Sequence, residues 1–395
     1  MNKKNLKKIL WISFFQAQGL DNTSLFNTLS QLSNFGHEVT LITVLSPRTN
    51  IFQNRLFKAI IIPFKRMPLL LSFLFTIILW FYLPIIIINS RIDTVVIEPG
   101  VQIISTIPSL FVSKIKKVNF ILDVRSTPVE TQFFSGKLLK YWFKVSVLIA
   151  KHTFDAITVI TSSMAKKLFD DFRITDKKMG IWTSGVSLDL FDPSMFQENA
   201  LQLRAKLNLL DCFVVFYHGA FTKSRGLLET INAVNLLKKR YPKIVLLLLG
   251  DGPFRSILEK AVNNYQLKDN VIITGPVDQI QVPNYICMSN LAIVPLPNNS
   301  YWRFQSPLKL LEYLAMEKTV VLTRIPAHID IVHDSECGIY LSSVDPKEIA
   351  REIELAYLDR ENLNDRGRVG RRLVEERYSW KRVVGDLEKL IVSFD

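Results

Sequence analysis

The sequence predicts an α/β protein of two domains, each a parallel sheet with helices on both faces. A chain of 395 residues exceeds the size of one ordinary domain. Short, continuously apolar segments alternate with helical patterns in both halves, which is typical of buried parallel strands. A polar stretch at 192–211 lacks a sheet pattern, so we expect the interdomain linker there. The predicted domains are residues 1–195 and 196–378.

Composition and charge narrow the classes of function. Hydrophobic residues make up 48% of the chain and charged residues 22%, which excludes a disordered or fibrous protein. The net charge is +13, and residues 1–190 account for +12 of it. A basic first half indicates an anionic partner, either acidic lipid or a phosphorylated substrate. Nucleic acid is the weakest candidate because no zinc-finger or RNA-binding signature is present. The three cysteines have no paired spacing, so we expect free thiols in a reducing compartment.

The first half reads as a series of strand–helix units. Strands are expected at 9–15, 39–44, 94–98, 120–124 and 156–160. A helix ends near Asn34, where Gly36 is a C-cap candidate, and a long helix is expected near 131–153. The N-terminal run imitates a secretory signal peptide, but it is short and lacks a small-residue cleavage pattern. We therefore interpret it as the first buried strand.

Residues 67–90 form an apolar segment without a charged side chain over 24 residues, long enough for a membrane-spanning helix. Three hypotheses compete: a helix in the membrane interface, a spanning or re-entrant hairpin that turns near Pro84, and a buried helix followed by a strand. A single span would separate strands of one sheet across the bilayer. We favour interfacial docking on the cytoplasmic face of the cell membrane, with the basic flanks at anionic headgroups. The expected membrane-facing positions are Leu69, Phe73, Thr76, Trp80 and Phe81.

The second half contains a glycine-containing loop with basic residues. Strands are expected at 213–217, 244–249, 271–274, 291–294 and 319–322. The first is followed by HGAFTKSRG, in which Gly219 and Gly226 permit tight turns and Lys223 and Arg225 lie near a helix start. Cations and helix N–H groups in this arrangement suit a diphosphate, whereas the alternative is a solvated loop. His218 lies beside the loop and is a candidate for contact with a sugar.

The sequence GDGPF follows the second strand of this half. A dinucleotide-binding fingerprint would require glycine where Arg255 stands, so an oxidoreductase site of that type is excluded here. Asp251 is a candidate for contact with the ligand, and its alternative role is to cap the next helix.

The stretch SPLKLLEYLAMEKTVVLT at 306–323 predicts a helix with Ser306 as N-cap and Pro307 as first helical residue. The free N–H groups of Leu308 and Lys309 would then be available to a phosphate. Lys309 and Glu312 are three residues apart, on one helix face, so the lysine can approach a diphosphate while the glutamate accepts hydrogen bonds from two ribose hydroxyls. The alternative is a plain salt bridge on a surface helix.

These motifs together resemble glycosyltransferase family 4. The family's order is matched by GHEVT, TSGVSLDLFDP, HGAFTKSRG, GDGP, ITG, PLKLLEYLAMEKTVV, ECGIYLSSVDPKEIA and RYSWKRVVGDLEKLI. The resemblance implies the GT-B fold, in which two Rossmann-like parallel-sheet domains face a cleft. It also implies that a C-terminal helix, residues 379–395, returns to the N-terminal domain.

The resemblance implies transfer of a sugar from a UDP- or GDP-sugar donor, with retention at the anomeric carbon. The donor would bind the second domain and the acceptor the first. Arg225 matches the family's basic diphosphate residue, Glu312 its ribose-binding glutamate, and Lys309 a frequent basic residue before it. Gly19 lies in the first-domain loop that approaches the donor phosphates. Arg225 and Lys309, with Asp123 on the acceptor side, are the expected catalytic residues.

Three positions depart from the family pattern. Phe304 stands where a first glutamate is frequent, Ala220 where an arginine follows the glycine, and Arg125 where a histidine ends a first-domain strand. Asp123 or Glu130 can replace that histidine in acceptor contacts. Such variation is similar to the subgroup that builds bacterial surface polysaccharides. It also leaves open a catalytically silent membrane-bound scaffold of a polysaccharide assembly complex, and a GT-B sugar-nucleotide epimerase.

The expected partners are a nucleotide-sugar donor, a lipid-linked or glycan acceptor and a membrane surface, without nucleic acid. No cofactor or metal is expected, because the sequence has no convincing Asp-x-Asp motif or zinc spacing and its cations can stabilise the diphosphate. The predicted pathway is the biosynthesis of capsule, O-antigen or exopolysaccharide.

Overall fold

The computed structural model describes residues 6–16, 23–45, 56–63, 68–128, 134–175 and 178–394. Two sequence predictions, Gly19 and Glu130, lie outside the described residues. The chain divides into two compact units. The first consists of Met1–Thr183 and Trp380–Asp395, and the second of Ser184–Ser379.

The division between the units differs from the expected boundary at residue 195. Residues after Thr183 join the second unit, because the Val186 N–H donates to the Tyr378 carbonyl at 2.8 Å and Phe191 is buried in that unit's core. The polar stretch predicted as a linker contains helix α6 (Gln197–Lys206). Helix α14 (Trp380–Val392) belongs to the first unit, as the predicted fold requires.

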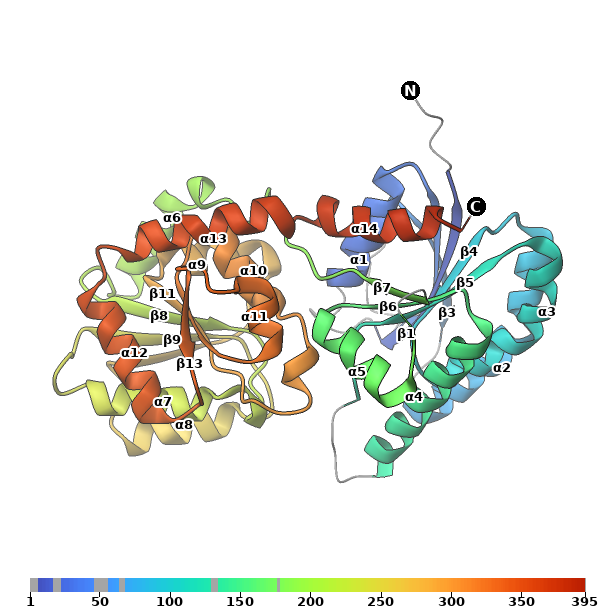
Figure 1. Cartoon of the computed structure of the whole chain (residues 1–395). Coiled ribbons are helices and arrows are strands. Elements are labelled where there is room, and N and C mark those ends of the chain that lie inside the picture. Colours follow the sequence, from blue (N-terminus) through green and yellow to red (C-terminus); the bar gives the residue numbers. More distant parts are fainter. Residues whose placement is uncertain are drawn as a thin grey trace. The chain divides into compact units, whose positions relative to one another are not determined.

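The first unit contains a parallel sheet in the order β3-β2-β1-β4-β5-β6-β7 (Figure 1). Its strands are β1 (Lys8–Gln16), β2 (Glu38–Leu45), β3 (Lys58–Pro63), β4 (Thr94–Ile97), β5 (Asn119–Val124), β6 (Ala156–Val159) and β7 (Met179–Ile181). Its other helices are α1 (Thr23–Asn34), α2 (Pro68–Asn89), α3 (Thr106–Lys116), α4 (Phe134–Thr153) and α5 (Ser162–Phe172). The sequence analysis did not predict β3 and β7, the two edge strands of this sheet; β7 has only three residues, whereas β3 is apolar from Ala59 to Ile62.

Helix α14 is held in the first unit by an apolar side and by a polar contact of Glu388. It buries Trp380, Val383, Val384, Leu387 and Ile391. Its Glu388 carboxylate lies 3.1 Å from Nε2 of His37, whose side chain is buried between β2 and the end of α1. Spacing of three and four residues between the buried positions explains why this terminal segment forms an amphipathic helix.

Helix α2 is one continuous helix that runs through Pro84, so the structure has no hairpin turn there. One stripe of the helix is buried in the first unit, with exposures of at most 4%: Leu71, Phe75, Leu79, Leu83 and Ile87. By length and apolar composition alone, residues Leu71–Asn89 form the one described helix that could cross a membrane, and 33% of that segment is buried in the protein.

The predicted membrane-facing positions of α2 divide between its two sides. Phe73 and Phe81 are exposed by 42% and 68%, whereas Trp80 is only partly exposed. Thr76 does not face outward. It is 7% exposed and its hydroxyl donates to the Ser72 carbonyl at 2.7 Å, so this prediction was wrong. The prediction failed because position 76 lies next to Phe75, a member of the buried stripe of α2, whose residues repeat every four positions. The side chain of Leu69 lies outside the described part of the structure.

The second unit contains a parallel sheet in the order β10-β9-β8-β11-β12-β13. Its strands are β8 (Phe213–His218), β9 (Ile244–Leu249), β10 (Val271–Thr274), β11 (Leu291–Val294), β12 (Val320–Thr323) and β13 (Gly338–Leu341). Its helices after α6 are α7 (Leu227–Leu237), α8 (Arg255–Asn264), α9 (Val282–Met288), α10 (Leu308–Ala315), α11 (Pro326–Val332), α12 (Pro346–Leu358) and α13 (Leu363–Arg377). Helices α7 and α8 cover one face of the sheet, and α9, α10 and α13 cover the other (Figure 1).

The strand order of the second unit creates a switch point between β8 and β11. The chain leaves β8 toward β9 on one side and later returns to β11 on the other, so the loops after β8 and β11 diverge there. In open parallel sheets, ligands bind at the carboxyl ends of the strands at such a point. The predicted diphosphate loop follows β8, and α10 follows the loop after β11.

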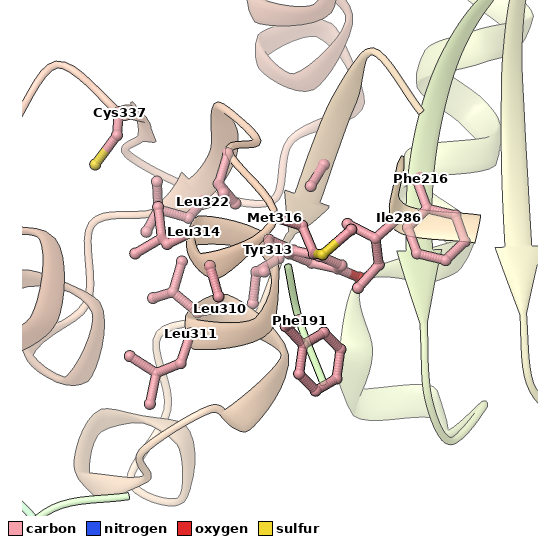
Figure 2. Packing of buried hydrophobic residues seen from close by; sticks show 14 of the residues in the cluster. Phe191, Phe216, Ile286, Leu310, Leu311, Tyr313, Leu314, Met316, Leu322 and Cys337 are labelled. Carbon is pink, nitrogen blue, oxygen red and sulfur yellow. The ribbon is translucent and has the colours of Figure 1, made fainter. Parts of the chain in front are cut away.

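Helix α10 is anchored by its apolar residues in the core of the second unit. Figure 2 shows Leu310, Leu311, Tyr313 and Leu314 on this helix, with Phe216 of β8 and Leu322 of β12 in the same buried cluster. These α10 side chains are completely buried. Because so much of the helix is fixed, its polar residues Lys309 and Glu312 have defined positions.

Candidate active site

Three side chains at the end of β8 and on α10 form a hydrogen-bonded network. The Tyr313 hydroxyl lies 3.0 Å from Nδ1 of His218, and Nε2 of the same ring lies 2.8 Å from the Glu312 carboxylate. The His218 backbone N–H also donates to the Tyr313 hydroxyl at 2.9 Å. A neutral ring fits this pattern when Tyr313 donates to Nδ1 and Nε2–H donates to Glu312. Both ring nitrogens are thus used to hold Glu312 in place.

Lys309 lies close to the backbone of the loop after β8. Its ammonium donates to the Tyr217 hydroxyl at 2.8 Å and lies 4.0 Å from the centre of the Tyr217 ring. Gly219, at φ +123°, makes this approach possible, because a Cβ there would lie 2.9 Å from the Lys309 Nζ. The glycine in the predicted loop therefore serves close packing of a cation as well as a turn.

Arg225 is held by an aromatic side chain from the loop after β11. Its guanidinium carbon lies 4.7 Å from the centre of the Trp302 ring, and the indole N–H of Trp302 donates to the Ser224 carbonyl at 2.7 Å. The adjacent Gly226 has φ +68°, and a Cβ there would lie 2.1 Å from the Pro295 carbonyl oxygen. Trp302 and Gly226 thus join the two loops and fix the position of Arg225.

The positive charges of Lys309 and Arg225 are not fully balanced by negative charges in the site. Burial, followed by the charge of Arg225, holds the pKa of Lys309 well below its usual range, and Glu312 opposes this shift. Burial raises the pKa of Tyr217 to about 12, so its hydroxyl stays neutral. Among the residues that the structure describes, Nε of Arg225 is buried without a hydrogen-bond partner. A buried donor without a partner next to a desolvated ammonium favours binding of an anion with several oxygen acceptors.

The structure brings His218, Gly219, Arg225, Lys309 and Glu312 together at the ends of β8 and β11, as the motifs indicated. Whether these residues bind a donor stays a prediction.

The remaining predicted donor residues differ from this group. Lys223 is exposed in the turn after β8, and Asp251 is exposed and accepts a hydrogen bond from the Gly252 N–H at 2.8 Å. Asp251 does not cap α8, which begins at Arg255 after Phe254. Leu308 is the first residue of α10, so its N–H has no partner within the helix.

The start of α10 differs from the expected capping. Pro307 precedes the helix in an extended conformation, and no side chain caps the first turn. The expectation of Ser306 as N-cap and Pro307 as first helical residue was therefore wrong by one position. Instead, the Leu310 N–H donates to the Pro307 carbonyl at 3.0 Å. An N-terminus without a side-chain cap leaves its N–H groups available to an external acceptor.

Sequence reasoning missed three aromatic residues of the site: Tyr217, Trp302 and Tyr313. Each positions a predicted polar residue rather than being one. The signal available in the sequence was adjacency, since Tyr217 precedes His218 and Tyr313 follows Glu312. Trp302 has no such signal, because its contact with Arg225 joins loops far apart in the chain.

The first unit has a separate cluster of buried charges at the ends of β4 and β5. Asp123 is fully buried, and its Oδ1 accepts hydrogen bonds from Thr158 at 2.6 Å and from the Trp182 indole at 3.0 Å. The Arg125 guanidinium carbon lies 3.9 Å from the centre of the Trp182 ring. Burial raises the pKa of Asp123, and Arg125 opposes the shift. Asp123 lies in the interior of the unit, and its catalytic role stays a prediction.

Glu98 belongs to the same cluster and is expected to make stability depend on pH. Burial raises its pKa to about 7, against a hydrogen bond donated by Ser13 at 2.7 Å. The folded state then binds the proton more tightly than the unfolded chain, so stability should fall as pH rises from 4.5 to about 7 and stay level above. The melting temperature of the wild type should therefore decrease between about pH 5 and pH 8. In Glu98→Gln, this decrease should be smaller by roughly 3–5 °C.

The control for this prediction is Glu38→Gln, measured by differential scanning fluorimetry over the same pH range. The pKa of Glu38 is lowered, first by a hydrogen bond from Lys8, so this variant should keep the decrease that Glu98 produces. An unchanged pH profile in Glu98→Gln would show that the Glu98 carboxyl is already ionised at pH 5.

Within the described residues, no group of three or more His, Cys, Asp or Glu side chains has the arrangement of a metal site. The three cysteines are free thiols, of which Cys337 is buried.

The second unit matches a known protein family. Residues 201–373 match the family model described as Glycosyl transferases group 1. CapM of Staphylococcus aureus, a capsular polysaccharide biosynthesis glycosyltransferase, is 24% identical over 241 residues, which are 60% of this chain and 61% of CapM. The chain spans 42% to 61% of the length of CapM and two further curated relatives.

Solved structures match the whole chain. The sucrose-phosphate synthase of Thermosynechococcus elongatus has a TM-score of 0.78 at 18% identity, covering 97% of this chain and 98% of that one. HepE of Anabaena, in complex with UDP-glucose, has a TM-score of 0.73 at 14% identity. The match covers 98% of this chain and 100% of the HepE chain. The protein has the GT-B fold of these structures, and the group 1 match to its second unit supports a glycosyltransferase.

Proposed function

We propose that the protein is a retaining glycosyltransferase of family 4 that transfers a sugar from a UDP- or GDP-sugar to a lipid-linked glycan. The donor would bind at the ends of β8 and β11. The single observation that carries this proposal is the pair of cations there: Lys309 is buried beside Arg225, and Nε of Arg225 has no hydrogen-bond partner in the described part of the chain. A diphosphate supplies the negative charge and the acceptor oxygens that these groups need.

Glu312 is suited to bind the ribose of the nucleotide. His218 holds one carboxylate oxygen, Oε2, at 2.8 Å, and the side chain of Glu312 is 14% exposed. The carboxylate therefore has a fixed orientation and an accessible edge. Two neighbouring ribose hydroxyls are the donors that match it, which agrees with a nucleotide and not with free diphosphate alone.

The reaction would exchange one bond at the anomeric carbon for another. The bond from this carbon to the diphosphate oxygen breaks, and a bond from an acceptor hydroxyl forms on the same face of the sugar. The electron pair leaves with the nucleoside diphosphate, and the hydroxyl proton passes from the acceptor to the departing diphosphate oxygen. We propose that Arg225, Lys309 and the free N–H groups at the start of α10 stabilise the charge that develops on the leaving diphosphate, without a metal ion.

The relatives support the donor class and the pathway. HepE was solved with UDP-glucose, and CapM is named for capsular polysaccharide biosynthesis. We propose that the acceptor of this chain is likewise a glycan carried on a lipid diphosphate. The exposed apolar residues of α2 and the basic first half of the chain fit such an acceptor, and we place the protein on the cytoplasmic face of the membrane.

A nucleotide screen tests the donor site. UDP or GDP at about 100 times its dissociation constant should stabilise the protein by roughly 2.7 kcal/mol, which raises the melting temperature by a few degrees. Arg225→Ala should abolish this rise. Arg303→Ala is the matched control, because Arg303 is an exposed arginine beside Trp302 in the same loop, and it should keep the rise.

The same screen separates the competing functions when nucleotide sugars are included and products are followed by mass spectrometry. Transfer to a lipid-linked glycan supports the proposal, and release of nucleotide with an altered free sugar indicates an epimerase. Absence of both nucleotide binding and turnover would point to the scaffold.

A further inference from the structure

Helix α3 has the reverse of the usual distribution of polar and apolar residues. It buries Thr106, Ser109 and Ser113 and exposes Ile107, Phe111 and Ile115 by 37%, 74% and 84%. The exposed residues are spaced by four, so they form one stripe along the helix. A helix on the surface of a water-soluble protein normally places such a stripe toward the core.

Two of the three buried polar residues of α3 are hydrogen-bonded locally, whereas Oγ of Ser109 has no hydrogen-bond partner among the described residues. The Thr106 hydroxyl donates to the Ile103 carbonyl at 2.7 Å, and the Ser113 hydroxyl donates to the Leu110 carbonyl at 2.9 Å. Small side chains on this face allow close packing, and α3 packs against α2, its neighbour in Figure 1. In the structure, the small polar residues occupy the buried face of α3 and its large apolar residues form the exposed stripe.

The neighbouring helix α2 exposes its own apolar residues. Its exposed side chains include Phe73, Ile77, Phe81, Ile85 and Ile88, each exposed by 42% to 68%. Two adjacent helices thus present large apolar side chains to the outside of the first unit. Isolated exposed apolar residues are ordinary, whereas a set of this size marks a surface that binds another apolar phase.

The charges around α3 determine which apolar phase fits. Lys114 and Lys116 lie in the last turn of α3 and Lys117 is its C-cap, and all three are exposed. No acidic residue occurs between 99 and 118, and residues 67–90 of the α2 segment carry no charge. Exposed apolar side chains and lysines, on segments that carry no carboxylate of their own, complement the acyl chains and headgroups of an anionic bilayer.

We infer that α3 is a second lipid-binding helix, which places Phe111 and Ile115 among the acyl chains of an anionic membrane and its terminal lysines at the headgroups. This inference rests on the membrane location in the proposed function and extends it from α2 to α3. Two packed helices then contact the bilayer. Contact through both helices holds the first unit in one orientation on the membrane, which contact through a single point does not.

Vesicle binding by the full chain tests the inference. Co-sedimentation should be measured with vesicles of phosphatidylcholine alone and of phosphatidylcholine with phosphatidylglycerol. Phe111→Ser combined with Ile115→Ser should weaken binding by about tenfold or more, because two large side chains lose their apolar surroundings. Lys114→Gln combined with Lys116→Gln should weaken binding by about tenfold on the anionic vesicles only.

The matched control is Met195→Ser combined with Leu201→Ser. These residues are exposed by 66% and 61% in the second unit, so their replacement removes similar apolar surface elsewhere and should leave vesicle binding unchanged. Far-UV circular dichroism and the nucleotide thermal shift establish that each variant is folded. Hydrogen exchange adds a direct readout, since peptides covering 106–117 should become protected when anionic vesicles are added to the wild type.

Each outcome supports or overturns the inference. If the Phe111 and Ile115 variant binds vesicles like the wild type, α3 does not contact lipid, and the membrane role of α2 is unaffected. Sedimentation velocity without lipid tests a different role of the stripe. If the wild type self-associates there and the Phe111 and Ile115 variant is a monomer, the stripe is a protein interface. If the wild type binds no vesicles, both membrane statements fail. The nucleotide thermal shift reports separately on the donor site.

Discussion

Lys309→Met is expected to lower sugar transfer by about two to three orders of magnitude while raising the melting temperature of the ligand-free protein by a few degrees. Burial and Arg225 hold the pKa of Lys309 well below its usual range, and in the described part of the chain its hydrogen-bond partner is the Tyr217 hydroxyl alone. Methionine fills a similar volume without the cost of a desolvated charge. The rise in melting temperature on addition of nucleotide should be lost.

Lys318→Met is the control, because Lys318 is also a lysine whose pKa burial lowers. Its ammonium donates to the Cys287 and Ser289 carbonyls at 3.0 and 2.9 Å, so its loss should lower the melting temperature and leave the nucleotide shift intact. If Lys309→Met behaves like Lys318→Met, Lys309 has a structural role and the proposed diphosphate site is wrong.

Glu312→Ala is expected to lower kcat/KM by about 100- to 1000-fold, because two hydrogen bonds from ribose to a charged acceptor are lost. The sharper measurement compares the nucleotide with its 2′-deoxy and 3′-deoxy forms. The wild type should bind each deoxy form about tenfold or more weakly, whereas Glu312→Ala should bind all three equally. Isothermal titration calorimetry measures these affinities.

Two variants separate ribose binding from structure at Glu312. His218→Ala removes the group that orients the carboxylate at 2.8 Å, so it should reduce discrimination against the deoxy forms without abolishing it. Glu336→Gln changes an exposed carboxylate of the same unit and should change nothing. If Glu312→Ala still discriminates against both deoxy forms, another residue binds the ribose.

The sequence predicted much of the fold, because parallel strands that are buried on both faces are continuously apolar. The strands that became β1, β2, β4, β5 and β6 were expected within a few residues. The edge strands β3, β7 and β13 were not predicted, although β3 is apolar and the edge strand β10 was expected, so edge position alone does not explain which strands were missed. Residues 184–195 were assigned to the wrong side of the boundary, because membership depends on contacts such as that from Val186 to Tyr378.

The sequence predicted which residue types form the candidate site, but it did not predict how their side chains contact one another. Arg225, Lys309 and Glu312 stand out because their motifs place cations and a carboxylate near strand ends and a helix start. The burial of Lys309 and the partner of each side chain could not be predicted. Trp302 and Arg225 are 77 positions apart in the numbering, and their contact depends on how two loops leave the sheet.

By itself, the sequence determined the alternation of strands and helices, the basic character of the first half and the positions of the motifs predicted to bind a diphosphate and a ribose. These are properties of periodicity, charge and spacing, which act over short stretches of chain. Only the tertiary structure decided which side of α2 and α3 is exposed, and which cations at the ends of β8 and β11 are buried. Exposure and desolvation depend on neighbours that are distant in sequence, so no local pattern records them.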